Sequence, residues 1–183
     1  LRFQGKTIPE LKQMLGITEN TKNIAATCVI RMFGTDCKRL NQISDFTKAG
    51  IIAKTITITP EGNRTEDMKL KHIDFEEWAD RDADFEDSDV YKYFCEHSFL
   101  CPIFCEHDSR DQRKTTFEGF KRFAFDDDFI ESEVRHTWED SRNLIHHNEL
   151  EWEYVYDSNG NKQLNSSGSY MGAPNLPKSS AYK

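Results

Sequence analysis

The spacing of hydrophobic residues along the chain predicts three helices. The first begins at Thr7, whose hydroxyl can cap it, and stops at Gly16. The second runs from about Thr21 to Phe33 and ends at Gly34, with apolar residues three and four positions apart. The third covers about residues 128–147. Because only one side of each helix is apolar, each is expected to pack against a core.

A different pattern, with a period of two, predicts the strands. The clearest strand is Gly50–Thr59, which is rich in β-branched residues and is closed by a turn at Pro60–Asn63. A partner strand is expected near Met68–Ile73. Ser98–Phe104 is typical of a buried strand that follows a helix, and alternating aromatic residues predict a last strand at Leu150–Tyr156.

Helices and strands therefore intermix along the chain, which predicts the α/β or α+β class. Three polar stretches connect or follow the elements. Glu76–Asp89 is acidic, and we expect a solvated loop or a short helix there. Asp157–Asn161 is a hairpin turn signal. Asn165–Lys183 is rich in Ser, Gly, Pro and Asn, which predicts a long binding loop or an ordered tail that leads into a later strand.

Composition narrows the class of protein. The chain has 183 residues, of which 37% are hydrophobic and 12% aromatic, so it has the size of one domain and is too apolar to be disordered. No apolar run approaches the roughly 18 residues that a membrane helix needs. Five irregularly spaced cysteines do not suit a disulfide framework, so we expect a reducing, cytoplasmic compartment. The chain starts at Leu1, and we expect a fragment of a longer polypeptide.

The net charge of −8 is unevenly distributed. Residues 1–60 carry nine basic and four acidic side chains, residues 61–157 carry 12 and 28, and residues 158–183 carry three lysines and no acid. Charge alone favours a solvated acidic surface in the middle of the chain. Binding depends on the local field, however, so the two basic ends still allow a polyanion to bind on one face.

Nuclease chemistry is suggested by Asp45, which precedes the main strand, and by Lys54 within that strand. Asp45 lies nine residues before Lys54, and Ile52 lies two residues before that lysine on the same strand face. Metal-dependent nucleases often place an aspartate and a glutamate around a shared Mg²⁺, with a lysine beside the scissile phosphate. Isoleucine cannot ligate a hard cation, so Asp45 alone would hold Mg²⁺ weakly. Taken alone, this common spacing is better explained by a loop aspartate and an edge lysine.

A longer resemblance adds to this pattern. Lys22–Gly34 and Asp45–Ile56 resemble the DNA mismatch-repair endonuclease MutH and its restriction-enzyme relatives that recognise GATC. Two glutamates of the family pattern fall on Ile30 and Ile52. The residues that match the pattern are Lys22, Gly34, Asp45, Gly50, Lys54 and Thr55.

The resemblance continues downstream. Val90–Phe104 resembles the helix-to-strand segment of the family, and Phe125–Leu150 resembles its long helix. The resemblance implies an α/β restriction-endonuclease-like fold, in which a mixed sheet is flanked by helices and two lobes form a cleft for DNA. It implies a single MutH-like domain over residues 1–183, with the base-reading strands expected after Lys183.

The lost glutamates imply a particular role within this family. With these replacements, the chain resembles the catalytically degenerate C-terminal domain of two-domain, GATC-specific type II restriction endonucleases. Such a domain binds GATC-containing duplex DNA without cleaving it, as an allosteric effector of the N-terminal catalytic domain of the same bacterial chain, and dimerisation on DNA is a possible consequence.

The same resemblance assigns roles to residues. No catalytic residue is expected, because Asp45 and Lys54 remain while Ile30 and Ile52 replace acids. Mg²⁺ belongs to the whole enzyme, and neither a metal nor another cofactor is expected in this domain. The lysines expected to contact phosphates are Lys22, Lys48, Lys54, Lys178 and Lys183.

Two alternatives remain open. The domain is itself a Mg²⁺-dependent endonuclease if Glu61 or Glu66 has moved into the ligand role. Alternatively, it is a degenerate nuclease fold that serves only protein contacts, with the acidic segment 74–89 as the partner surface.

Other clusters have simpler explanations. Cysteines and histidines crowd between Cys95 and His107, but no Cys-x2-Cys pair occurs, so buried core cysteines are favoured over zinc. Asp126–Asp128 is best explained by helix capping. His146 and His147 suit a helix end. The aromatic residues at positions 152, 154 and 156 could stack on bases, but strand alternation favours core packing.

Overall fold

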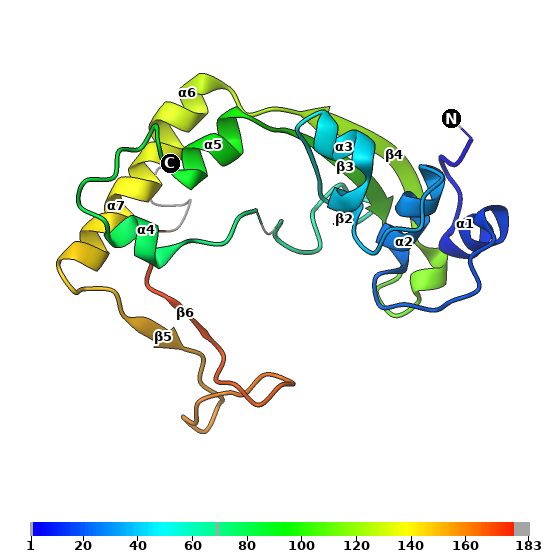
Figure 1. Ribbon diagram of the computed structural model, residues 1–183. Helices are drawn as coiled ribbons and strands as arrows, with labels where there is room; N and C mark the ends of the chain where they lie inside the picture. Colours follow the sequence, from blue (N-terminus) through cyan, green and yellow to red (C-terminus); the bar gives the residue numbers. More distant parts are fainter. Residues whose placement is uncertain (1, 69, 178–183) are drawn as a thin grey trace. The chain divides into compact units, whose positions relative to one another are not determined.

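The computed structural model describes residues 2–68 and 70–177. The chain divides into two compact units (Figure 1). The first unit comprises residues 1–70 and 96–125, and the second comprises residues 71–95 and 126–183. Both units contain helices and strands, so the protein has the predicted mixed α/β character.

A mixed sheet organises the first unit. Its central strand is β3 (Ser98–Cys105). Two short strands, β1 (Ile51–Ala53) and β2 (Ile56–Ile58), run parallel to β3 on one side, and β4 (Thr116–Phe123) runs antiparallel to it. The sheet is therefore mixed, as predicted. Gly50, just before β1, has a φ of +59°, and a Cβ there would lie 3.1 Å from the carbonyl oxygen of Glu96. This position accordingly requires glycine.

The strand predicted over residues 50–59 is interrupted at Lys54 and Thr55. Ile51 pairs with Ser98 and Ile56 pairs with Ile103, so the register is unchanged across the interruption. This register places Pro102 opposite Thr55. The alternation of the ladder would direct the N–H of residue 102 at the carbonyl of Lys54, and proline has no N–H to donate. The missing donor explains why the ladder is broken at this point.

One predicted strand is absent from the described residues, and one observed strand was not predicted. Met68 and residues 70–73 do not form the predicted partner strand. The chain instead turns back directly after β2, with the Thr59 N–H donating to the Asn63 carbonyl at 2.8 Å. The sequence also gave no indication of β4, because Gly119 and the adjacent Lys121 and Arg122 obscure its alternation.

Helices cover one face of this sheet. The first is α1 (Ile8–Leu15), followed by α2 (Ile24–Met32), the 3₁₀ turn η1 (Leu40–Gln42), α3 (Ser44–Lys48) and, before β4, the 3₁₀ turn η2 (Gln112–Lys114). Residues of the helices and of the sheet share one hydrophobic core, in which Leu11, Val29 and Phe104 are fully buried. Thr7 and Glu10 form a reciprocal capping box, and Gly16 adopts the left-handed conformation at the helix end, so the predicted start and stop of α1 are confirmed.

The second unit is mostly helical. It contains α4 (Phe75–Ala79), α5 (Asp89–Cys95), α6 (Asp127–Phe129), a π-helical turn η3 (Ile130–Val134) and α7 (Arg135–His146). The long helix predicted over residues 128–147 is confirmed, although a π-helical turn interrupts it. Ile130, Val134 and Trp138 on its apolar side are buried, and Ile145 is half-buried. Among the described residues, none of the helices has both the length and the apolarity that crossing a membrane requires.

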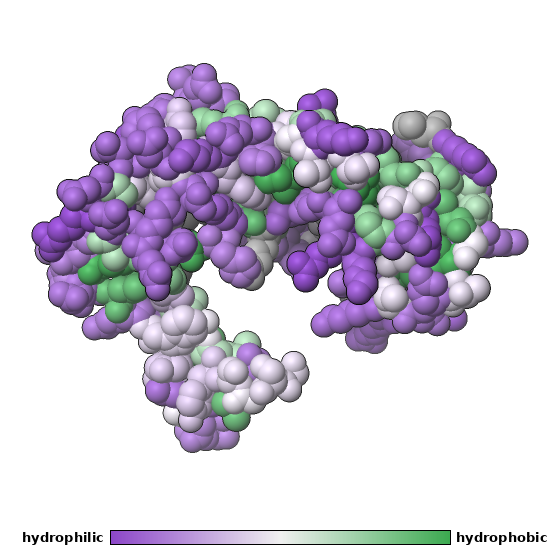
Figure 2. All heavy atoms as spheres, viewed as in Figure 1, coloured by the Kyte–Doolittle hydropathy of each residue, from purple (hydrophilic) through white to green (hydrophobic). Residues whose placement is uncertain are grey.

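A small β arm follows α7. Its strands are β5 (Trp152–Tyr154) and β6 (Gly172–Pro174), which pair antiparallel. Core packing was predicted for the aromatic residues here and is wrong, because the exposed fractions of Trp152 and Tyr156 are 51% and 54%. Strand alternation shows which side chains share a face but not whether anything covers that face. In Figure 2 most of the arm is pale, which marks residues of intermediate hydropathy.

The tip of the arm contains two turns of the same design. Oδ1 of Asp157 accepts from the N–H groups two and four residues later, and Oδ1 of Asn165 does the same. Gly160 and Gly168, three residues after each, both have a φ of +82°. This eight-residue repeat confirms the predicted turn at 157–161 and shows that part of the expected tail is a second, ordered turn.

The capping box of α1 makes a pH-dependent prediction. The pKa of Glu10 is lowered to about 2, first by the hydrogen bond from the Thr7 backbone N–H and then by Lys6. The stabilisation by this carboxylate is therefore fully present above its ordinary pKa of 4.5 and is lost as the pH falls toward 2. We expect Glu10→Gln to lower the unfolding midpoint in urea at pH 6, with a difference from the wild type that shrinks between pH 4.5 and 2. A difference independent of pH would contradict this account.

Candidate nucleic-acid interface

The sheet face opposite Ala53 carries two of the residues that the sequence singled out, and Phe99 and Cys101 on this face are buried. Ala53 belongs to the core under the helices, so alternation places Ile52 and Lys54 on the opposite face. Ile52 pairs with Phe99 in β3. The structure therefore brings Ile52 and Lys54 together on one face of the strand.

The register adds a second lysine to this face. The register places Lys54 opposite Cys101, and Cys101 pairs with Lys121 of β4. The three residues therefore lie side by side in one row across the strands. Two strand spacings separate the lysine backbones by about 10 Å. Lys121 is exposed and Cys101 is buried between them. Burial raises the pKa of the Cys101 thiol, so this cysteine stays neutral and the row is positively charged.

Lys54 is held in place by the chain that follows the β2 turn. Its Nζ donates to the carbonyl oxygen of Leu70 at 3.0 Å. A cavity of about 300 Å³ lies beside it and is lined by residues 54–57 and by Arg64, Glu66, Asp67 and Met68. Arg64 contacts Asp67 at 3.8 Å, but both side chains are largely exposed, so this ion pair contributes little.

The other predicted site residues are dispersed. Ile30 is 5% exposed and lies in the core under the helices, so it does not share a face with Ile52. Asp45 is exposed in the first turn of α3, and Lys48 is exposed in its last turn. Lys22 is exposed before α2.

The predicted phosphate contacts of the C-terminal tail, Lys178 and Lys183, lie outside the described residues. Lys121 is the residue that sequence reasoning missed. No pattern in the sequence marked it, because its place in the row of Lys54 depends on the pairing of β4 with β3.

The donor set at this face does not fit Mg²⁺. Ile52 offers no oxygen, Glu66 lines the cavity beside Lys54, and Glu61 is exposed in the turn after β2. Within residues 2–68 and 70–177, no group of three or more His, Cys, Asp or Glu side chains is placed to hold a metal ion. No hydrolytic step can be derived from this arrangement.

The remaining clusters have structural roles. Cys101 and Cys105 are 1% and 7% exposed in β3, as expected of core cysteines. Asp126 accepts from the Phe129 N–H at 2.8 Å and so caps α6. His146 and His147 end α7, where His147 Nδ1 lies 2.8 Å from the Asn143 carbonyl oxygen.

Comparison with known proteins gives no further assignment. No protein-family model matches this chain, and no curated protein matches its sequence.

The contact between Lys54 and Leu70 makes a stability prediction. Lys54→Met keeps the length of the side chain but removes the donor to the Leu70 carbonyl. We expect the free energy of unfolding to fall by about 1 kcal/mol, and amide hydrogen exchange over residues 65–71 to become faster. Lys48→Met is the matched control, since its side chain is exposed and its effect should stay within about 0.5 kcal/mol. Equal exchange in both variants would show that Lys54 does not hold this segment.

Proposed function

We propose that this chain is a MutH-like domain of the restriction-endonuclease fold that binds GATC-containing duplex DNA without cleaving it. The observation that carries the proposal is the strand face on which Ile52 and Lys54 lie together. In the family pattern these two positions hold a glutamate and a lysine. Here the lysine that can contact a phosphate is kept, whereas the oxygen donor that would hold a metal is replaced by a hydrocarbon.

The topology of the first unit supports the fold part of this proposal. The helix matched to the family motif is α2, and α3 with Asp45 leads directly into the parallel strands β1 and β2. The antiparallel strand β4 then completes a mixed sheet. This order of elements agrees with the order of the motif residues.

The charge distribution supports binding of a polyanion by the first unit. Its sequence carries 16 basic and 12 acidic side chains, whereas that of the second unit carries eight and 20. Lys54 and Lys121 lie in one row of the sheet, and neutral Cys101 between them adds no opposing charge. Lysines that neutralise phosphates release counterions, which contributes sequence-independent affinity.

The role within a larger enzyme is part of the same proposal. The domain would act as the effector of an N-terminal catalytic domain, so that GATC bound here favours cleavage elsewhere. Such coupling is allosteric if occupancy of either site changes the affinity of the other by the same factor. Mg²⁺ would then be needed for cleavage by the whole enzyme and not for binding by this domain.

Binding of a fluorescent duplex tests the proposal. In EDTA, we expect a duplex with one GATC to bind at least about tenfold more tightly than a scrambled duplex of the same composition, measured by anisotropy over a salt series. Lys54→Gln and Lys121→Gln should each weaken binding and reduce the slope of log affinity against log salt by about one. Lys92→Gln, on α5 of the second unit, is the control.

The outcomes separate the alternatives. Equal affinity for both duplexes would contradict GATC specificity. No affinity for either at moderate salt would instead favour a domain that serves only protein contacts, for which the acidic segment 74–89 is the candidate surface. Unchanged salt slopes in both lysine variants would remove this sheet face from the interface.

A second candidate function is favoured by one observation, namely that Glu66 lines the same cavity as Lys54. In this alternative, Glu66 would be one ligand of Mg²⁺ and the chain would cut at GATC, although the described residues place no group of three possible metal ligands there. Incubation of unmethylated GATC plasmid with the protein and Mg²⁺ would then produce nicks, and Glu66→Gln would abolish them while leaving binding in EDTA unchanged.

A further inference from the structure

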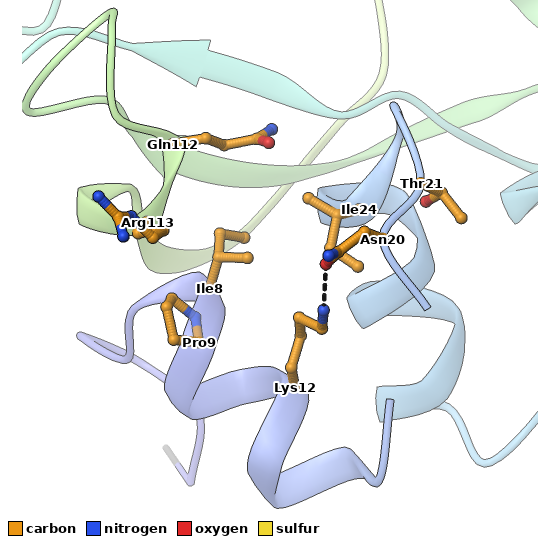
Figure 3. Close-up of a pocket in the computed structure, with 8 residues that line it drawn as sticks. All are labelled: Ile8, Pro9, Lys12, Asn20, Thr21, Ile24, Gln112 and Arg113. Atoms are coloured by element: carbon orange, nitrogen blue, oxygen red, sulfur yellow. Dashed lines mark hydrogen bonds between the residues drawn. The ribbon is translucent and has the colours of Figure 1, made fainter. Parts of the chain in front are cut away.

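A second pocket lies in the first unit and shares no lining residue with the cavity beside Lys54. Figure 3 shows that it lies between α1, the loop that precedes α2, and η2. Its volume is about 400 Å³, which is within the range of small-molecule sites. Its apolar part consists of Ile8, Pro9 and Ile24. Ile8 and Ile24 are about 95% buried and belong to the core of the unit, so they form the floor of the pocket, whereas Pro9 is exposed.

The polar residues of the pocket favour an anion. Lys12 and Arg113 line it, and no aspartate or glutamate is among its lining residues. Arg113 is already neutralised by Asp111, with Nε 2.8 Å from Oδ1. Lys12 Nζ instead donates to Oδ1 of Asn20, a neutral amide (Figure 3). This contact orients the ammonium group without cancelling its charge, and two of its three N–H donors remain for a ligand.

The neutral side chains of the pocket add hydrogen-bonding capacity. Thr21 and Gln112 lie on the wall with Asn20, and they supply both donors and acceptors. A ligand that satisfies the whole pocket therefore has one anionic group for Lys12, a flat or apolar body for the exposed ring of Pro9 above Ile8 and Ile24, and polar atoms at its edge.

We propose that this pocket binds a small organic anion of the nucleoside monophosphate class, with the phosphate on Lys12 and the base over the apolar residues. The source of this chemistry is either a free nucleotide or the phosphorylated end of a DNA strand. The site is separate from the proposed phosphate contacts of Lys54 and Lys121, and it does not depend on GATC recognition.

Titration of ¹⁵N-labelled protein with deoxyadenosine 5′-monophosphate tests the proposal. We expect saturable shifts of the amides of residues 8–12, 20–24 and 112–113. Deoxyadenosine should bind about tenfold more weakly, because it lacks the charge-assisted hydrogen bond to Lys12. Inorganic phosphate should also bind more weakly, because it makes no contact with the apolar residues. A 5′-phosphorylated oligonucleotide that binds more tightly than the free nucleotide would identify a strand end as the source.

Variants of Lys12 make the test specific. Lys12→Gln should weaken binding of the monophosphate about tenfold and leave the affinity for deoxyadenosine unchanged. Lys12→Arg should keep most of the wild-type affinity for the monophosphate. Lys114→Gln, on the same turn as Arg113 but outside the lining residues, is the control. Thermal unfolding checks that each variant is folded. The proposal is overturned if millimolar monophosphate causes no saturable shifts or shifts only other residues. It is also overturned if Lys12→Gln binds the monophosphate as tightly as the wild type does. The proposal is likewise overturned if Lys12→Gln loses as much affinity for duplex DNA without a strand end as it loses for the monophosphate.

Discussion

The first unit depends on the position of β3, since every other strand of its sheet pairs with this one strand. A strand with neighbours on both sides has its backbone N–H groups committed, and Pro102 lacks one of them. The sheet tolerates this proline because the neighbouring strand is interrupted where the donor is missing. The interruption coincides with Lys54, whose side chain extends to the carbonyl of Leu70. One backbone constraint thus explains the break between β1 and β2, which falls at this lysine.

Local signals explain which elements could be predicted from the sequence. The start and end of α1 are encoded within ten residues by Thr7, Pro9, Glu10 and Gly16, and the structure has each in its expected role. The interruption at Lys54 depends on a proline in another strand, so a reading of residues 50–59 alone could not reveal it. The exposed aromatic residues of the arm were misassigned for a related reason, because burial depends on what packs against a face and not on its alternation.

The residues of the candidate site also differ in whether the sequence alone could place them. The shared face of Ile52 and Lys54 follows from the two-residue period of a strand and was predictable. The place of Lys121 depends on its pairing with Cys101, which is a long-range fact. Ile30 shows the limit of motif spacing, since its alignment with a family glutamate does not bring it to the face of Ile52. Its burial under the helices is the ordinary behaviour of an isoleucine in an amphipathic helix.

The electrostatics of position 52 bear on the proposal of binding without cleavage. A carboxylate two residues before Lys54 would lie about 7 Å away along the strand. At an effective dielectric constant near 20, it would repel a phosphate bound at that lysine by about 2 kcal/mol, before screening by salt. A nuclease compensates this repulsion with its metal ion, whereas a domain without the metal gains affinity by losing the carboxylate. Isoleucine at position 52 therefore suits the proposed binding of phosphate through lysines, whereas Glu66 and Asp67, which line the neighbouring cavity, would oppose such binding.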